Sequence, residues 1–124
     1  MFASKKAEHK YIDRGDPSSA DFAVGDLTED GSYHDLDLSV IIPKTAKLVL
    51  LRIEIKIVEG GINGIFRKKG NCNELNAEKF FTLIGGYPRF FTFKLSCNSE
   101  GVIEYKVDSG YWIIFNITVG GWWI

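Results

Sequence analysis

The sequence is poor in the residues from which catalytic and metal sites are usually built. Its 124 residues include only two histidines, His9 and His34, and two cysteines, Cys72 and Cys97. Neither histidine has a cysteine or carboxylate at metal-ligand spacing, and no Ser-His-Asp or Cys-His set can be assembled. We therefore expect no metal, no cofactor and no enzymatic activity. Because no secretory signal is visible, we expect two separate thiols and not a disulfide.

Two further absences narrow the class of protein. No run of 18 apolar residues occurs, so a membrane-spanning helix is not expected. Fifteen basic residues against sixteen acidic ones give a net charge of -1, which disfavours nucleic-acid binding because such proteins need a concentrated positive surface. The first ten residues hold three lysines and no apolar run, so no signal peptide is visible and a cytoplasmic location is the default expectation.

Aromatic residues, by contrast, are plentiful. Nine Phe, five Tyr and three Trp make up 14% of the chain, a composition that suits strands and interfaces. The length is that of one ordinary domain with its own core. Residues 1–20 are polar, with Gly15 and Pro17 near their end, and we predict an N-terminal arm there, followed by a single β-sandwich domain over residues 21–124.

Apolar and polar residues alternate with a period of two along most of the chain, which predicts β-strands. The two longest are expected at 47–58 and 111–119. Shorter strands are expected at 21–24, 33–38, 65–67, 80–84, 90–97 and 102–107. Pairs such as Gly60-Gly61 and Asn63-Gly64 predict a turn, and residues 73–79 suit a helical turn.

Strands separated by Gly, Asn, Asp and Pro turns are typical of a sandwich or barrel. We therefore predict an all-β fold: a two-sheet antiparallel sandwich of jelly-roll or Greek-key type. It should have about seven to nine strands and at most one short helical turn.

Several segments carry a family resemblance. They are Asp30–Leu38, Ile42-Pro43, Lys47–Leu51, the turn Phe66–Asn73, Gly101–Tyr105 and Gly120–Trp123. Together they resemble a recurrent module of uncharacterised bacterial, environmental and phage-associated proteins, some of them tail-fibre-like. The resemblance implies a small sandwich fold and supplies no catalytic residues. It also implies a virion-associated location if the chain derives from a phage.

Two short motifs are interpreted as chance matches. Arg14-Gly15-Asp16 spells the tripeptide of integrin ligands, and Asn116-Ile117-Thr118 is a glycosylation sequon. A sequon is expected by chance about once in every chain or two of this size, and a given tripeptide in roughly one or two chains in a hundred. We expect the first to be part of an ordinary polar arm and the second to lie unused inside a strand.

The acidic and histidine side chains of the 33–38 strand allow alternatives. Asp35 and Asp37 point the same way, which would suit Ca²⁺ or a glycosidase pair, but alternating solvated acids are the favoured interpretation. His34 shares its strand face with Leu36 and Leu38, so we predict a partly buried edge histidine and not a ligand or base.

The aromatic residues are the best functional lead. Adjacent Trp122 and Trp123 cannot both point into the core of an extended strand. One of them, or Trp112 on the polar face of its strand, is predicted to lie on the surface, and Tyr87 and Phe90 would extend that surface.

We expect a non-enzymatic structural or interaction module that self-associates through aromatic strand faces, its partner being a second copy of itself. The alternative is a sandwich that binds a carbohydrate or small ligand by stacking it on exposed rings. A cupin- or glycosidase-type enzyme is disfavoured, because two isolated histidines cannot supply a clustered ligand set.

Overall fold

Eight β-strands and one 3-10 turn make up the computed structural model, which describes residues 10–124. Residues 1–9 of the predicted arm, which include His9, lie outside the described residues. The strands are β1 (Tyr11–Asp13), β2 (Tyr33–Asp37), β3 (Leu48–Ile57), β4 (Ile62–Lys68), β5 (Glu78–Thr82), β6 (Arg89–Ser96), β7 (Val102–Val107) and β8 (Trp112–Trp123), and the 3-10 turn is η1 (Val24–Asp26).

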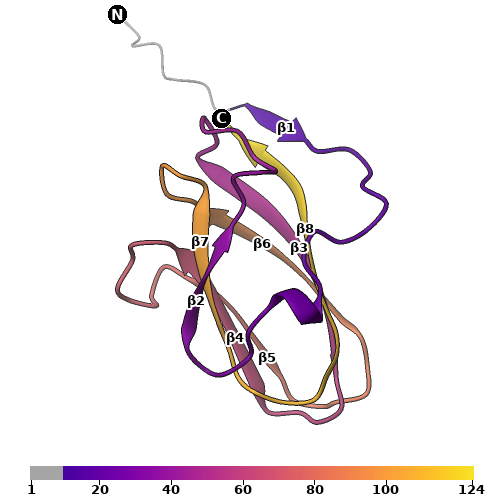
Figure 1. The fold of residues 1–124 in the computed structure, drawn as a ribbon. Helices are drawn as coiled ribbons and strands as arrows, with labels where there is room; N and C mark the ends of the chain where they lie inside the picture. The colour runs from indigo at the N-terminus through magenta and orange to yellow at the C-terminus, as the bar shows by residue number, and fades with distance from the viewer. Residues whose placement is uncertain (1–9) are drawn as a thin grey trace, which may run out of the picture.

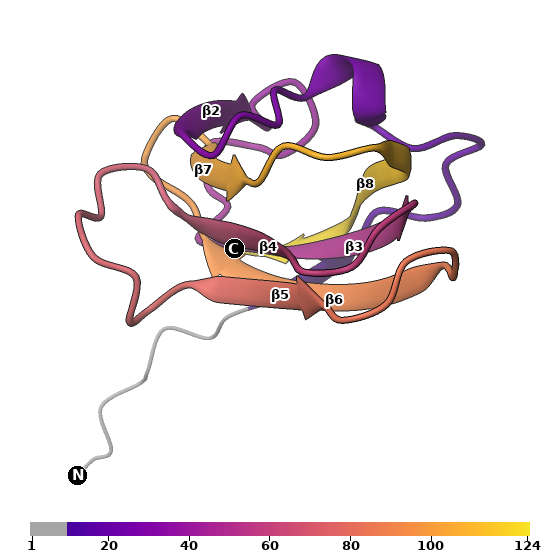
Figure 2. The same cartoon turned by 90° about the horizontal axis from the view of Figure 1, so that it is seen from below.

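The strands pair as one long hairpin folded over on itself. Antiparallel pairs join β1 to β8, β2 to β7, β3 to β6 and β4 to β5. The folding adds two further pairs, β8 with β3 and β7 with β4. The result is a first sheet of order β1-β8-β3-β6 facing a second sheet of order β2-β7-β4-β5 (Figures 1 and 2). This is the jelly-roll arrangement, so the predicted fold class is confirmed.

The core lies between the two sheets. The predicted inward face of β3, from Val49 to Ile57 at alternate positions, is at most 2% exposed. It meets Phe66 of β4 and Phe80 of β5, which point inward from the second sheet. Burying an aliphatic or aromatic side chain of this kind contributes about 1.5–3 kcal/mol, so this alternation is what holds the layers together.

Two bulges reverse the alternation of β8 at its ends. The register of β8 against β3 shifts at two positions. Ile113 has no partner on β3 at the first shift, and Gly120 has none at the second. Each extra residue turns the following side chains to the opposite face. Trp112 therefore packs against the core instead of lying on the polar face, while Tyr111 and Ile113 are exposed. This corrects the face prediction at the start of the 111–119 strand.

Three local predictions were wrong. The 21–24 segment forms no strand; Phe22 makes a single bridge, and η1 follows because the Asp26 carboxylate accepts a hydrogen bond from the Ala23 N–H at 2.9 Å. Asn63-Gly64 lies inside β4, where a Cβ on Gly64 would come within 2.2 Å of the Phe80 ring, so this glycine serves packing and not a turn. Residues 73–79 form no helix, and β5 begins at Glu78.

Part of the predicted arm belongs to the first sheet. Tyr11–Asp13 form β1, paired with Gly121–Trp123 of β8. The chain then leaves the sheet and returns at Asp21 and Phe22, whose N–H groups both donate to the carbonyl of Ile117. The segment from residue 14 to residue 20 is therefore a loop closed at both ends on β8.

Candidate functional site

Three loops meet at the end of the sandwich opposite the C-terminus (Figure 1, bottom). They are the β3–β4, β5–β6 and β7–β8 connections, and backbone hydrogen bonds join them: Gly86 N–H to the Ile57 carbonyl at 2.7 Å, and Val58 N–H to the Tyr111 carbonyl at 3.1 Å. The β3–β4 and β5–β6 loops also approach too closely for side chains. A Cβ on Gly60 would lie 2.0 Å from the Leu83 carbonyl oxygen.

Because the loop backbones are in contact, their large side chains are displaced toward solvent. The exposed fractions range from 51% to 75% for six apolar residues, which we call the apolar end: Val58, Leu83, Ile84, Tyr87, Tyr111 and Ile113. Single exposed apolar residues are ordinary, but a cluster on interlocked loops is typical of an interaction surface. None of the six carries a charge.

The structure does not bring the five predicted aromatic residues to one surface. Tyr87 belongs to the apolar end. Phe90, 71% exposed, projects from the start of β6 on the outer face of the first sheet. Trp112 and Trp122 pack against the core. Trp123 lies on the outer face, with its ring centroid 4.7 Å from that of Tyr11 in β1.

Trp112 and Trp123 each have defined partners. The indole N–H of Trp112 donates to the Asp108 carbonyl at 3.2 Å, and its ring centroid is 4.8 Å from that of Phe115. The Lys94 ammonium lies 5.4 Å from the Trp123 ring centroid, which is a cation–π contact. Both side chains are therefore held in place by the protein itself.

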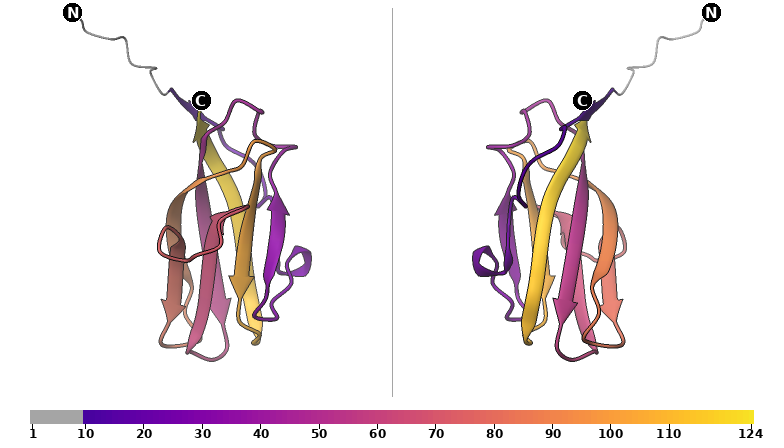
Figure 3. Two further views of the ribbon diagram at one scale, coloured as in Figure 1. Left: turned by 90° about the vertical axis from the view of Figure 1, so that its left-hand side faces the viewer. Right: turned by 90° about the vertical axis from the view of Figure 1, so that its right-hand side faces the viewer.

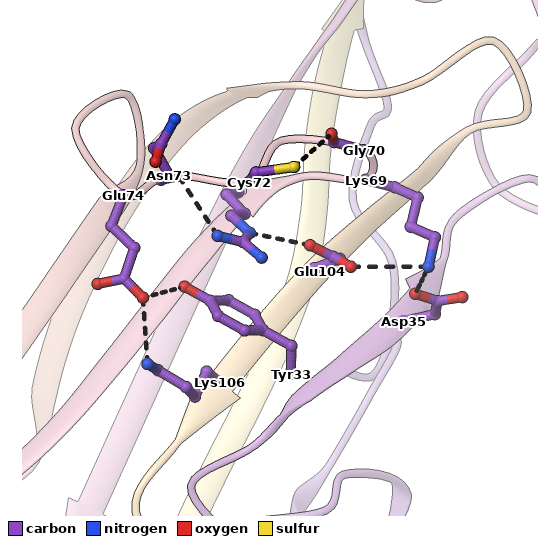
Figure 4. A network of polar contacts seen from close by, with 10 residues as sticks. Tyr33, Asp35, Lys69, Gly70, Cys72, Asn73, Glu74, Glu104 and Lys106 are labelled. Carbon is purple, nitrogen blue, oxygen red and sulfur yellow. Dashed lines mark hydrogen bonds and ion pairs between the residues drawn. The ribbon is translucent and has the colours of Figure 1, made fainter.

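Sequence reasoning missed a network of charged groups on the outer face of the second sheet, beneath the β4–β5 loop (Figure 4). The Arg67 Nε donates to a Glu104 carboxylate oxygen at 2.9 Å, and its guanidinium carbon lies 3.7 Å from the Tyr33 ring centroid. Lys106 lies 4.8 Å from the same centroid and 3.1 Å from Glu74. The Tyr33 hydroxyl donates to the Glu74 carboxylate.

The charges of this network balance. Lys69 adds a third cation, 2.8 Å from Asp35 and 3.6 Å from Glu104. Burial, followed by the hydrogen bond to Glu74, raises the pKa of Tyr33 to about 12, and that same bond lowers the pKa of Glu74. Each ionic group has a partner of opposite charge, so the network anchors the loop. Alternation places Arg67 and Glu104 outward, but the loop partner Glu74 has no signal in the sequence.

The remaining candidate residues are engaged within the chain. The Arg14 guanidinium pairs with Asp21 and donates to the Val119 carbonyl at 3.2 Å. The arginine of the Arg14-Gly15-Asp16 motif is therefore held against β8 by these contacts. His34, half-buried as predicted, has its Nε2 2.9 Å from Asp30; this hydrogen bond lowers the pKa of Asp30.

Asp35 and Asp37 both face outward, as predicted, but they have separate partners. Asp35 pairs with Lys69, whereas Asp37 accepts the Ser39 N–H at 2.9 Å. Hydrogen bonds from Ser39 lower the pKa of Asp37. Across residues 10–124, no three His, Cys, Asp or Glu side chains are grouped so that they could hold a metal ion.

The two cysteines are separate thiols, as predicted. Cys97 is buried next to the inner face of β6, and burial raises its pKa. Cys72 is exposed in the β4–β5 loop.

Comparison with known proteins adds little beyond the fold. No protein-family model matches the chain, and no curated protein matches its sequence. Among solved structures, the chain is similar to the coat protein of tobacco streak virus, with 15% identity and a TM-score of 0.37 over 93% of this chain and 83% of that one. A likeness at this level says nothing about what this chain binds. Residues 10–124 contain no helix with the length and hydropathy of a membrane span.

Proposed function

We propose that the protein is a non-enzymatic structural module that forms homo-oligomers by burying its apolar end against the same surface of a second copy. The observation that carries the proposal is the exposure of six apolar side chains, five on three interlocked loops and Ile113 at the adjoining start of β8. Each large apolar side chain that leaves water on association contributes about 1.5–3 kcal/mol before the cost of ordering is subtracted. Loops already held by backbone contacts keep that cost low.

A second copy fits this surface better than a charged partner. A two-fold contact places the same residues on both sides, and apolar side chains complement themselves. Glu59 in the β3–β4 loop and Arg89 at the start of β6 are exposed and opposite in charge, so a two-fold contact can place each against the other. The net charge of -1 produces little repulsion between copies. A structural role also agrees with the resemblance to phage-associated modules.

Sedimentation velocity with light scattering tests the proposal on the full chain. We expect a mass of twice the 14.0 kDa of the single chain at tens of micromolar. The Leu83→Glu and Tyr87→Glu double variant should weaken association by at least about 100-fold, because it places charges in the centre of the contact. Circular dichroism would show that the variant is folded.

The matched control is Leu75→Glu. Leu75 is 98% exposed in the β4–β5 loop and is not part of the apolar end. It should leave the mass unchanged. A wild-type protein that stays monomeric at these concentrations, or a control that dissociates as readily as the double variant, would show that the apolar end is not the contact.

A further inference from the structure

The outer face of the first sheet holds a shallow groove of about 450 Å³, separate from both the apolar end and the charged network. It lies across β6, β3 and β8, the three strands that face the viewer in the right-hand view of Figure 3. This volume is within the range of small-ligand sites.

Two cross-strand rows of side chains form the floor. Arg52 of β3 is registered between Thr92 of β6 and Thr118 of β8. In the next row, Glu54 is registered between Phe90 and Asn116. The intervening residues Ile53 and Ile117 are buried in the core and Phe91 packs against it, so all six project from the outer face.

Two different walls bound the floor. On the β6 side stands Phe90, whose ring is mostly exposed. On the β8 side stands the loop of residues 17–20. Asp21 anchors this loop, because its carboxylate pairs with Arg14 and accepts the Val119 N–H at 2.8 Å. The groove exists because the chain leaves β8 after β1 and returns at Phe22.

The floor offers polar groups that the protein does not use. The Arg52 guanidinium donates to the Thr92 hydroxyl at 3.0 Å. Among residues 10–124, no side-chain hydrogen bond or ion pair engages the Glu54 carboxylate, the Asn116 amide or the Thr118 hydroxyl. The floor therefore presents acceptors and donors together, and its one positive and one negative charge cancel.

We propose that this groove binds a neutral saccharide. An exposed aromatic ring beside a mixed donor and acceptor floor matches a pyranose, which has an apolar C–H face and hydroxyls that both donate and accept. The sugar ring packs on Phe90, and its hydroxyls bond Glu54 and Asn116. Because Arg52 and Glu54 cancel, an anionic ligand gains nothing over a neutral one. This inference is independent of self-association.

A glycan array carrying neutral and acidic glycans, probed with the full chain, tests the proposal. The best neutral glycan is then titrated by calorimetry. We expect Phe90→Ala and Glu54→Gln each to weaken its binding at least about tenfold. Glu54→Gln keeps the shape of the side chain, so weaker glycan binding by this variant cannot be ascribed to misfolding.

The control is Phe81→Ala, which removes an exposed phenylalanine from β5 in the other sheet. It should bind the glycan as the wild type does. The proposal is overturned if no neutral glycan is retained, if only acidic glycans bind, if Phe90→Ala binds normally, or if Phe81→Ala is weakened equally. Oligomer mass, measured on the same samples, should not change with Phe90→Ala.

Discussion

The guanidinium of Arg67 lies 3.7 Å from the centroid of the Tyr33 ring, and the hydroxyl of that ring donates to Glu74. The arginine comes from β4, the tyrosine from β2 and the glutamate from the β4–β5 loop, so one aromatic ring connects an edge strand, a central strand and a loop. Since Arg67 also bonds Glu104 of β7, three of the four strands of the second sheet contribute to this contact.

This contact predicts an alkaline transition. The pKa of Tyr33 is raised to about 12 in the folded protein, above its value near 10 in the unfolded chain. The fold favours the neutral phenol, so this stabilisation is fully present below about pH 10 and is lost as pH rises toward about 12. Absorbance titration of wild type minus Tyr33→Phe should show a phenol ionising near pH 12. Urea unfolding across that range should show a steeper loss of stability in the wild type, and equal losses in both proteins would contradict the assignment.

A second prediction concerns Gly64. Because its Cβ would overlap the Phe80 ring at 2.2 Å, Gly64→Ala should lower the free energy of unfolding by about 1–3 kcal/mol. Phe80→Leu alone also costs stability by leaving a cavity. Combined, the two should cost less than the sum of the single changes, since the smaller side chain makes room for the methyl group. Additive losses in urea unfolding would mean that the two positions do not compete for space.

Deletion of Ile113 tests the first bulge. Ile113 has no partner on β3, whereas Trp112 and Ile114 on either side of it do. Removing it should restore regular alternation, keep Trp112 in the core and cost less than about 1.5 kcal/mol. Asn116, by contrast, is paired with Glu54 of β3. Deleting it should turn every preceding side chain of β8 to the opposite face and lower the stability several times more than deleting Ile113. Thermal unfolding compares the two, with Trp fluorescence reporting burial; similar losses would place the bulge elsewhere.

The thiols should differ sharply in reactivity. Cys97 is buried, and burial raises its pKa. Only a small fraction of the Cys97 side chains is therefore in the thiolate form at neutral pH. Titration of the native protein with a chromogenic disulfide should release one equivalent rapidly, from Cys72, and the second only on unfolding. Cys72→Ser should remove the fast phase. Rapid release of two equivalents from native protein would show that the β6 end opens readily.

The fold class was predictable because jelly-roll strands carry their signal locally. Alternation over residues 47–58 identifies both β3 and its inward face, since each side chain's direction follows from its neighbours. The same rule failed for Trp112. A bulge depends on how β8 registers against β3, and nothing within β8 alone reveals where an extra residue will be tolerated.

The sequence by itself determined that the chain is an all-β sandwich, because alternation and turn residues are local properties. Only the tertiary structure decided which aromatic residues meet solvent and which meet one another. Val58, Leu83 and Tyr111 lie far apart along the chain. They form one apolar end because glycines let the β3–β4 and β5–β6 backbones touch and a backbone hydrogen bond joins Val58 to Tyr111 of the β7–β8 loop. The rows of Arg52 and Glu54 across the first sheet likewise exist only through strand register, which long-range pairing sets and no single segment encodes.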